Sequence, residues 1–324
     1  MYTLKTCQEI IKKHLTAVEL PESPALLYDP IRYVIGLEAK RIRPSLTLLA
    51  CNLFTDLIEV SVNPALAIEL FHNFTLLHDD IMDNSDLRRG QPTVHKKWNI
   101  NTAILSGDTM LIKAYVYMSK CPGTILSKVL DVFNHTALEV CEGQQFDMDF
   151  ESDKQISVKD YLKMIELKTS VLIAASLKIG AICGGASDRD SDLLYQFGRN
   201  LGIAFQLQDD MLDVYADPGL FGKSIGGDII ANKKTFLLIS ALNMAKDELL
   251  KNLNNWIGKK EFDRDAKIRA VTEIYNILNI KELTKSRIIE LFKEAQLSLD
   301  KVSVSMEKKS ELGEFATLLM TREK

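Results

Sequence analysis

A long apolar segment that ends in three aspartates constrains the fold of this chain more than any other feature. Pro64 opens the segment, which continues as ALAIELFHNFTLLHDDIMD to Asp83. Because proline is favoured in the first turn of a helix, the sequence predicts one helix of about 20 residues, roughly 30 Å long. A helix of that length crosses a domain core, so its acidic end is expected at the rim of that core.

The acidic end is a candidate cation site. Asp79 and Asp83 are four residues apart, with Asp80 beside them, so their carboxylates project from one face of a helix. Oxygen ligands of this kind favour a hard cation, Mg²⁺ before Zn²⁺. Arg88 and Arg89 follow, and guanidinium groups suit phosphate oxygens. Taken alone, the stretch fits a metal-bridged phosphate ester and a solvated, charged helix end equally well.

A second acidic cluster favours the first of these interpretations. Asp209, Asp210 and Asp213 repeat the spacing of the first cluster, again at the end of an apolar helical stretch. Lys223 and the pair Lys233–Lys234 follow, in and beyond a glycine-rich loop. The simplest geometry places the two acidic ends opposite each other across a helix bundle, with metal ions between them and a diphosphate bridging the metals.

Helical periodicity extends over most of the chain. Only 8 prolines and 16 glycines interrupt 324 residues, and apolar residues between them follow helical spacing more than strict alternation. Besides the segment from Pro64, the expected helices cover Thr3 to Val18, Pro30 to Ile35, Ser45 to Phe54, a stretch from about Thr93, Ala103 to Met118, Ile125 to Asp149, Val158 to Gly184, Leu193 to Tyr215 and most of the chain after Gly227. No boundary resembles a flexible linker. We therefore expect a single all-α domain over residues 1–324, an antiparallel helix bundle around a central cavity.

Composition excludes several other classes of protein. The net charge of −4 argues against a general nucleic-acid-binding protein. Five scattered cysteines without a CxxC spacing indicate free thiols in a reducing, cytoplasmic compartment. The first residues, MYTLKTCQEIIKKHL, are typical of an amphipathic helix and lack the apolar region of a signal peptide. The most apolar later stretch, Val171 to Ala186, is short and interrupted by Lys178, which favours a buried helix over a membrane span.

Lys168 adds a cation to the candidate site. It lies in an otherwise apolar helical segment, where a buried lysine needs an anion or a cavity, although a lysine that extends to the surface also fits. A diphosphate neutralised by metals, arginines and lysines becomes a good leaving group by Lewis-acid and electrostatic catalysis. An apolar cavity below it would shield a reactive cation from water. In agreement, the sequence contains no convincing Cys/His pair.

An ordered set of motifs resembles the polyprenyl synthetase family, the trans-isoprenyl diphosphate synthases. The matching segments are Lys40–Pro44 (KRIRP), Asp79–Asp83 (DDIMD) with Arg88–Gly90 (RRG), Gly143–Asp147 (GQQFD), Lys168–Thr169, Phe205–Asp213 (FQLQDDMLD), Gly222–Lys223 and Gly226–Lys233 (GGDIIANK). A lone DDxxD is a weak signal, whereas this ordered set spans most of the chain. The resemblance implies the isoprenoid synthase fold and a homodimer.

The same resemblance implies a role for each matching residue. The residues that would hold Mg²⁺ are Asp79, Asp83 and Asp209, with Asp80, Asp210 and Asp213 in or near the metal shell. The residues that would bind the allylic diphosphate are Arg88, Lys168, Lys223 and Lys233. The residues that would bind the diphosphate of isopentenyl diphosphate are Lys40, Arg43, His72 and Arg89. Thr169 and Gln206 lie where the family stabilises the developing allylic cation.

The implied reaction is a Mg²⁺-dependent prenyl transfer. The allylic diphosphate ionises, the double bond of isopentenyl diphosphate attacks the cation, and a proton is lost to the departing diphosphate. A terpene cyclase would not need the isopentenyl-binding set, and a non-catalytic regulatory subunit could lose acidic ligands, which are complete here. Two details are ambiguous: Ala39 stands where many relatives have glycine, and Lys234 competes with Lys233, which the family spacing favours.

Residues before the first acidic cluster bear on product length. Phe74 is five residues before Asp79, about 7.5 Å along a helix axis, and its ring fits either the floor of a product cavity or the apolar core. Thr75 beside it is small. Long-chain members of the family that this chain resembles usually have a small residue at the position of Phe74, so the resemblance implies a short or medium product, with C20 preferred and C15 next. Glu69 and His72 also match half of a di-metal carboxylate motif, but the sequence has no second copy.

Overall fold

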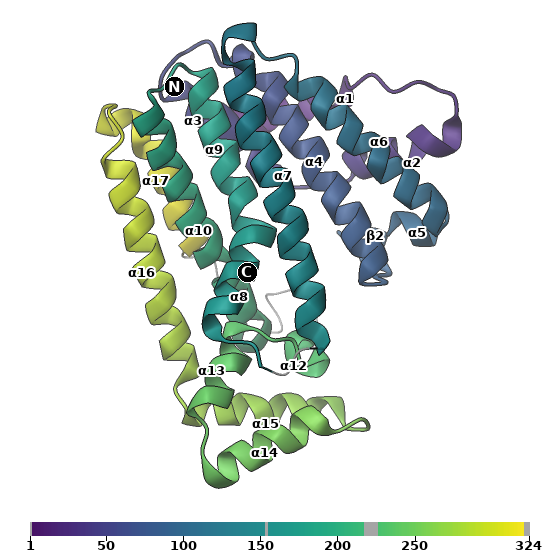
Figure 1. Cartoon of the computed structure of the whole chain (residues 1–324), viewed down its shortest axis with the longest axis vertical. Helices are drawn as coiled ribbons and strands as arrows, with labels where there is room; N and C mark the ends of the chain where they lie inside the picture. Colours follow the sequence, from purple (N-terminus) through teal and green to yellow (C-terminus); the bar gives the residue numbers. More distant parts are fainter. Residues whose placement is uncertain (1, 153–154, 217–225, 321–324) are drawn as a thin grey trace. The chain divides into compact units, whose positions relative to one another are not determined.

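The computed structural model describes residues 2–152, 155–216 and 226–320, and these residues are almost entirely helical (Figure 1). The predicted all-α fold is confirmed, with one small hairpin added to it. Within the described residues, no helix has the length and apolar character needed to cross a membrane.

The helices and strands follow one another with short connections. Those of the first part of the chain are α1 (Leu4–Thr16), α2 (Ala25–Gly36), α3 (Ile42–Asn52), the 3₁₀ turn η1 (Ile58–Ser61), α4 (Val62–Met82), β1 (Leu87–Arg88), β2 (Gln91–Pro92), α5 (Val94–Lys97) and α6 (Ile100–Met118). Those that follow are α7 (Gly123–Ser152), α8 (Val158–Ile165), the π turn η2 (Glu166–Ser170), α9 (Val171–Cys183), α10 (Asp188–Tyr215), α12 (Gly227–Ala231), α13 (Phe236–Met244), α14 (Asp247–Gly258), α15 (Arg264–Ile277), α16 (Ile280–Asp300) and α17 (Met306–Met320).

The chain forms two compact units. The first unit comprises Met1–His135, Ala175–Tyr195 and Val302–Leu312. The second unit comprises Thr136–Ala174, Gln196–Lys301 and Gly313–Lys324. That both units act as a single domain stays a prediction.

In the first unit, α4 packs along α6 and against α3. Apolar side chains from α2, α4, α5 and α6 form one core cluster, Ile31, Val34, Leu77, Val94, Ala103 and Met110. Helix α4 ends at Met82, and Asn84 adopts a left-handed φ of 49°, which asparagine tolerates better than most residues. The first acidic cluster therefore lies at the C-terminal end of α4, as predicted.

A two-stranded hairpin follows α4. Leu87 pairs with Pro92 and Arg88 with Gln91, and both turn residues, Arg89 and Gly90, have positive φ (53° and 74°). Positive φ at both positions matches the right-handed twist of the strands. The hairpin turn gives Arg89 a backbone conformation different from that of its neighbour Arg88.

In the second unit, α8, α10, α13 and α16 share one apolar cluster built around Tyr161, Leu207, Ile239 and Leu291. A second cluster joins α12 to α15, and α14 and α15 lie side by side (Figure 1). The charged residues described below lie outside these two apolar clusters, on α7, α10 and α12.

Three expected helix boundaries were wrong. The helix expected from Pro30 begins at Ala25, because the packing of Ile31 and Val34 in the apolar core outweighs the backbone hydrogen bond that Pro30 removes. The helix expected from Leu193 begins at Asp188, since the Ser187 hydroxyl caps it by accepting from the Asp190 N–H at 3.1 Å. The single helix expected from Val158 to Gly184 is interrupted by the π turn η2.

Candidate functional site

Four of the residues predicted to bind a diphosphate line one pocket in the first unit. The pocket has a volume of about 330 Å³. Lys40 precedes α3, Arg43 lies in the first turn of α3, His72 lies on α4, and Arg89 lies in the hairpin turn. The structure thus gathers side chains from three separate segments of the chain into one basic pocket.

The polar atoms of this pocket are arranged for an anion. Arg43 Nη1 lies 3.2 Å from Nε2 of His72, and because a guanidinium can only donate, the imidazole nitrogen accepts. Burial and then the charge of Arg43 hold the pKa of His72 well below its usual value, so the ring is neutral. In the described part of the chain, the buried Nε of Arg43 finds no hydrogen-bond partner. An unpaired buried guanidinium N–H is a ready donor for a phosphate oxygen.

The first acidic cluster pairs with Arg88. Asp80 is buried, and its Oδ1 lies 2.6 Å from Nη2 of Arg88, which is 3.6 Å from Oδ2 of Asp79. Asp83 caps α4, donating its N–H to the carbonyl of Asp79 at 2.9 Å, and is exposed. Burial raises the pKa of Asp80, while Arg88 opposes the rise. The two neighbouring arginines therefore have different environments. Arg88 pairs with the carboxylates of the first acidic cluster, and Arg89 lines the basic pocket.

Phe74 and Thr75 lie one to two turns before the cluster on α4. The Phe74 ring is half-buried and meets the rings of Phe71 and His78, at centroid distances of 5.7 and 4.8 Å. The Thr75 hydroxyl donates to the carbonyl of His72 at 2.8 Å. These contacts fit a core role and a cavity floor alike, so a role in product length stays a prediction.

In the second unit, the π turn η2 carries Lys168 and Thr169. Lys168 Nζ lies 2.6 Å from Oδ2 of Asp147 on α7, so its partner is a protein carboxylate. Both Lys168 and Thr169 are half-buried. The backbone of α7 approaches the π turn so closely at Gly143 that a Cβ there would lie 2.2 Å from the Lys168 nitrogen. Single π turns inside helices are frequent at functional sites.

The second acidic cluster lies on the last turns of α10. Asp210 is buried, accepts a hydrogen bond from the hydroxyl of the fully buried Tyr161, and accepts from Nε2 of Gln206 at 3.1 Å. Burial and the charge of Asp228 raise the pKa of Asp210 to about 7. Asp209 is half-buried on the same helix.

Asp213 is connected by hydrogen bonds through Asp228 to the segment that carries Lys233. Its Oδ2 accepts from the Asp228 N–H at 2.9 Å, and Lys233 donates its N–H to the Asp228 carbonyl at 2.9 Å. Burial raises the pKa of Asp228 to about 6, with Asp213 and Asp147 adding to the rise and Lys233 opposing it. Lys233 is thus among the carboxylates.

Lys234 lines a different pocket of the second unit, with Gln155 and Ser157. The preference for Lys233 over Lys234 stays a prediction. Lys223 lies outside the described residues.

The charged clusters suit magnesium bound together with a phosphate ligand. Among the residues that the structure describes, no three Asp, Glu, His or Cys side chains converge to hold a metal by themselves. Mg²⁺ is commonly bound by one or two carboxylates plus substrate phosphates. Burial, with neighbouring carboxylates adding to it, raises the pKa of Asp210 and Asp228, and a divalent cation would stabilise their ionised forms.

Known proteins are similar to this chain in both sequence and fold. The family model described as polyprenyl synthetase matches residues 24–276. The chain belongs to the polyprenyl synthetase family. A geranylgeranyl diphosphate synthase of Methanosarcina mazei is 42% identical over 274 residues, which are 82% of this chain and 82% of the relative.

Solved structures of polyprenyl synthetases superpose over nearly the whole chain. The crystal structure of a geranylgeranyl pyrophosphate synthase has a TM-score of 0.95 at 41% identity and covers 100% of both chains. A geranylgeranyl pyrophosphate synthase from Corynebacterium glutamicum, complexed with isoprenyl diphosphate and magnesium, has a TM-score of 0.87 at 28% identity and covers 99% of this chain and 100% of that one. The resemblance seen in the sequence, the isoprenoid synthase fold and the class of enzyme, a trans-prenyltransferase, are confirmed.

The sequence did not assign several residues that shape this polyprenyl synthetase site. Asp147 and Asp228 lie inside quoted motifs but had no role, and Tyr161 lies outside every motif. The buried pair Arg41 and Glu69 also lines the basic pocket. Arg41 lies inside the quoted KRIRP motif, and Glu69 stands three residues before His72 in the rejected di-metal motif.

Proposed function

We propose that this polyprenyl synthetase condenses isopentenyl diphosphate with an allylic diphosphate and releases a short or medium trans-polyprenyl diphosphate, with C20 first and C15 next. The observation that carries the proposal is the basic pocket, in which Lys40, Arg43, His72 and Arg89 converge. The geranylgeranyl products named for the relatives support the preferred length.

The basic pocket is the proposed site of isopentenyl diphosphate. Its neutral His72 and unpaired Arg43 Nε provide fixed positions around an anion, and Lys40 and Arg89 add positive charge. The homoallylic diphosphate is retained during the reaction, so a pocket that neutralises it with side chains alone suits it.

The allylic diphosphate is the proposed ligand of the acidic clusters and their neighbouring cations. Asp79, Asp83 and Asp209 are the proposed Mg²⁺ ligands, with Asp80, Asp210 and Asp213 nearby. Bound Mg²⁺ supplies Lewis-acid stabilisation of the charge that develops on the leaving diphosphate. Arg88, Lys168, Lys223 and Lys233 neutralise the remaining oxygens, which lowers the barrier to ionisation.

Neutral dipoles then face the carbon centre. Thr169 and Gln206 carry a hydroxyl and a carboxamide, whose oxygens can stabilise an allylic cation without a covalent bond. The Gln206 amide donates to Asp210, which leaves its carbonyl oxygen as the end directed at a positive charge. The departing diphosphate takes the proton that is lost after condensation.

A homodimer is proposed from the exposed face of α6. Ile100 and Ile104 are four residues apart, as are Ile112 and Val116, and all four are exposed, Ile112 at 64%. They form two apolar patches on either side of the exposed Asp108. Replacing Ile112 with glutamate is expected to give a monomeric mass by light scattering; an unchanged dimer mass would contradict the proposal. A cytoplasmic location is proposed because all five cysteines are free thiols.

One assay tests the reaction against its two alternatives. Purified protein is incubated with Mg²⁺, labelled isopentenyl diphosphate and each allylic primer in turn, and the products are sized. Elongation is expected, with loss of activity in EDTA and recovery with added Mg²⁺. Cyclic hydrocarbon products would indicate a terpene cyclase, and no elongation with any primer would indicate a regulatory subunit.

The two neighbouring arginines provide a test of the site. Arg89→Gln is expected to raise the KM for isopentenyl diphosphate, and Arg88→Gln the KM for the allylic substrate. An effect of Arg89→Gln on the allylic KM alone would make the assignment wrong.

A further inference from the structure

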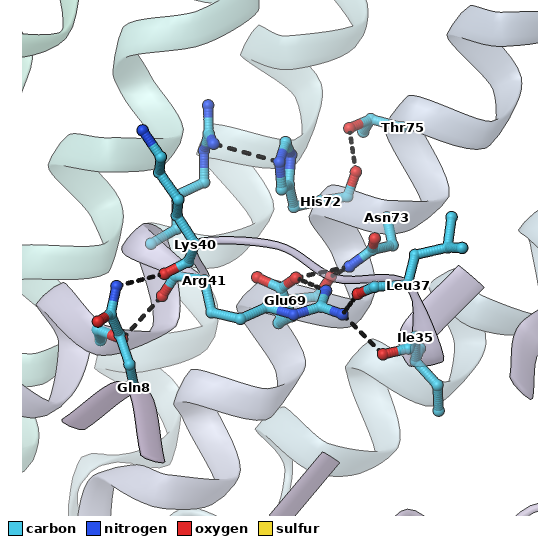
Figure 2. A network of polar contacts seen from close by, with 11 residues as sticks. Gln8, Ile35, Leu37, Lys40, Arg41, Glu69, His72, Asn73 and Thr75 are labelled. Carbon is cyan, nitrogen blue, oxygen red and sulfur yellow. Dashed lines mark hydrogen bonds and ion pairs between the residues drawn. The ribbon is translucent and has the colours of Figure 1, made fainter. Parts of the chain in front are cut away.

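Arg41 stands between two of the proposed ligands of isopentenyl diphosphate but makes contacts of a different kind. Figure 2 shows the neighbouring side chains of Lys40 and Arg41 extending in different directions, with Arg41 reaching Glu69, Leu37 and Ile35. The side chain of Arg41 is only 7% exposed and that of Glu69 only 2%. A buried ion pair therefore underlies the basic pocket.

The pair connects the segment that carries Lys40 to the helix that carries His72. Arg41 Nη1 donates to Oε1 of Glu69 on α4, and Nη2 donates to the carbonyls of Ile35 at 2.6 Å and Leu37 at 2.8 Å. One guanidinium thus holds the end of α2, the loop after it and α4 in a fixed relation. No other side chain can donate in three directions from a rigid plane.

The backbone and the neighbouring side chains complete the network. The Arg41 carbonyl accepts from the N–H of Ser45 at 3.2 Å and from its hydroxyl at 2.8 Å, which fixes the first turn of α3 that carries Arg43. On α4, Asn73 Nδ2 donates to Oε1 of Glu69 at 2.8 Å and to its carbonyl at 2.7 Å (Figure 2). One carboxylate oxygen of Glu69, Oε1, therefore accepts from both Arg41 and Asn73.

The backbone of Arg41 is in a conformation that its side chain must maintain. Its φ is 48°, in the left-handed region, which glycine adopts freely and an arginine only at a cost. Such a conformation persists where surrounding contacts over-determine it. The presence of arginine where glycine would fit more easily points to a requirement for the side chain.

Glu69 also balances part of the positive charge of the pocket. Lys40, Arg41, Arg43 and Arg89 all line the pocket, and Glu69 is the buried carboxylate among the lining residues. Its charge opposes the lowering of the pKa of Arg43 and Arg89, in which burial is the largest cause. Glu69 thereby offsets part of the repulsion among several guanidinium groups that lie close together.

We propose that Arg41 and Glu69 are positioning residues that set the affinity for isopentenyl diphosphate by fixing Lys40, Arg43 and His72 relative to one another. The inference rests on the proposed assignment of this pocket to isopentenyl diphosphate. Neither residue is required to contact the substrate, and the allylic diphosphate is unaffected by them.

Two variants of Arg41 separate positioning from charge and from backbone shape. Arg41→Lys keeps the positive charge but cannot donate to three fixed acceptors, and Arg41→Gly keeps the left-handed turn but removes the side chain. Both are expected to raise the KM for isopentenyl diphosphate by about tenfold or more, equivalent to about 1.4 kcal/mol, with the allylic KM within about twofold of wild type. Arg32→Gln is the matched control, because Arg32 on α2 donates to Asp29 at 2.6 Å and to the carbonyls of Leu20 at 2.8 Å and Pro21 at 2.5 Å.

Each other outcome overturns the inference. A wild-type KM in Arg41→Lys would show that only charge matters, and a wild-type KM in Arg41→Gly that only the turn matters. An equal rise for both substrates, or the same rise in Arg32→Gln, would indicate general loss of structure, which thermal unfolding of each variant measures directly.

Arg43→Gln separates this inference from the proposed function. If Arg43→Gln leaves the KM for isopentenyl diphosphate unchanged, the assignment of the pocket is wrong. If Arg43→Gln raises it and Arg41→Lys does not, only the positioning role is wrong. As a readout without turnover, inorganic pyrophosphate is expected to slow amide hydrogen exchange of residues 37–43 in the wild type, and to lose this effect at the same concentration in Arg41→Lys.

Discussion

Replacing Gly143 with alanine is expected to displace the π turn that carries Lys168 and Thr169. The new Cβ would lie 2.2 Å from the nitrogen and 2.7 Å from the Cα of Lys168, and 2.7 Å from the carbonyl carbon of Leu167. Non-bonded heavy atoms of this kind prefer separations of about 3.5–4.0 Å, so the two backbones must move apart by roughly 1 Å. All three atoms belong to backbone, so no side chain can rotate away.

The magnitude follows from this geometry. Inserting a methyl group into a packed site costs about 1–3 kcal/mol, and each kcal/mol lowers Tm by at most about 2–4 °C, the shift typical of shorter chains of about 150–250 residues. The larger effect falls on catalysis, because Lys168 pairs with Asp147 one turn along α7 at 2.6 Å and a shift of about 1 Å can cost on the order of a hundredfold in rate. We therefore expect a modest loss of stability and a large loss of kcat.

Steady-state kinetics at saturating substrate and thermal unfolding by circular dichroism measure both quantities. Gly123→Ala is the matched control, since Gly123 begins the same helix and a Cβ there meets nothing within 4 Å. The control is expected to retain wild-type kcat and Tm. A Gly143→Ala variant with wild-type kcat would refute the argument that close backbone approach positions Lys168.

Three further expectations concern other parts of the site. Burial disfavours the charged form of His72 and lowers its pKa, so as the pH falls through about 6.5 the unfolded chain takes up a proton before the folded chain does. The free energy of unfolding of the wild type should therefore fall relative to that of His72→Gln between about pH 7.5 and 5, by up to about 1.4 kcal/mol for each pH unit below about 6.5. A constant difference between the two proteins over this range would contradict the expectation. Phe74→Ala should lengthen the product if its ring forms the cavity floor, and an unchanged product distribution would leave Phe74 as a core residue. Tyr161→Phe leaves the buried Asp210 without its hydroxyl donor, which should cost about 1–3 kcal/mol in denaturant unfolding; an unchanged midpoint would show that this hydrogen bond is dispensable.

The sequence predicted the features that depend on local spacing. The helix from Pro64 to Asp83 was expected within two residues of its observed bounds, Val62–Met82, because apolar side chains at helical spacing determine both the helix and the face that it buries. The carboxylates at its end followed from the same register. The basic pocket was expected only through the resemblance, since Lys40, His72 and Arg89 are far apart in the chain.

Features that depend on a partner distant in sequence could not be predicted. The helix after the π turn at Glu166–Ser170, Val171–Cys183, is apolar on nearly all sides, so periodicity does not register the turn and indicates one continuous helix. Whether Lys168 contacts an anion or extends to the surface could be decided only from the position of Asp147 on another helix. Tyr161 looks like an ordinary core residue until its hydroxyl is found beside Asp210.

Residue type and spacing by themselves therefore determined most of the helices and the two acidic clusters, because side-chain chemistry and helical register are properties of the local chain. The ordered motifs carried the resemblance to the family. The tertiary structure decided which cation serves which group. In it, Arg88 pairs with Asp80, Arg89 lines the basic pocket, and Arg41 is buried against Glu69. Those assignments depend on the direction of each side chain after the hairpin and the left-handed turn have formed, and no local pattern specifies that direction.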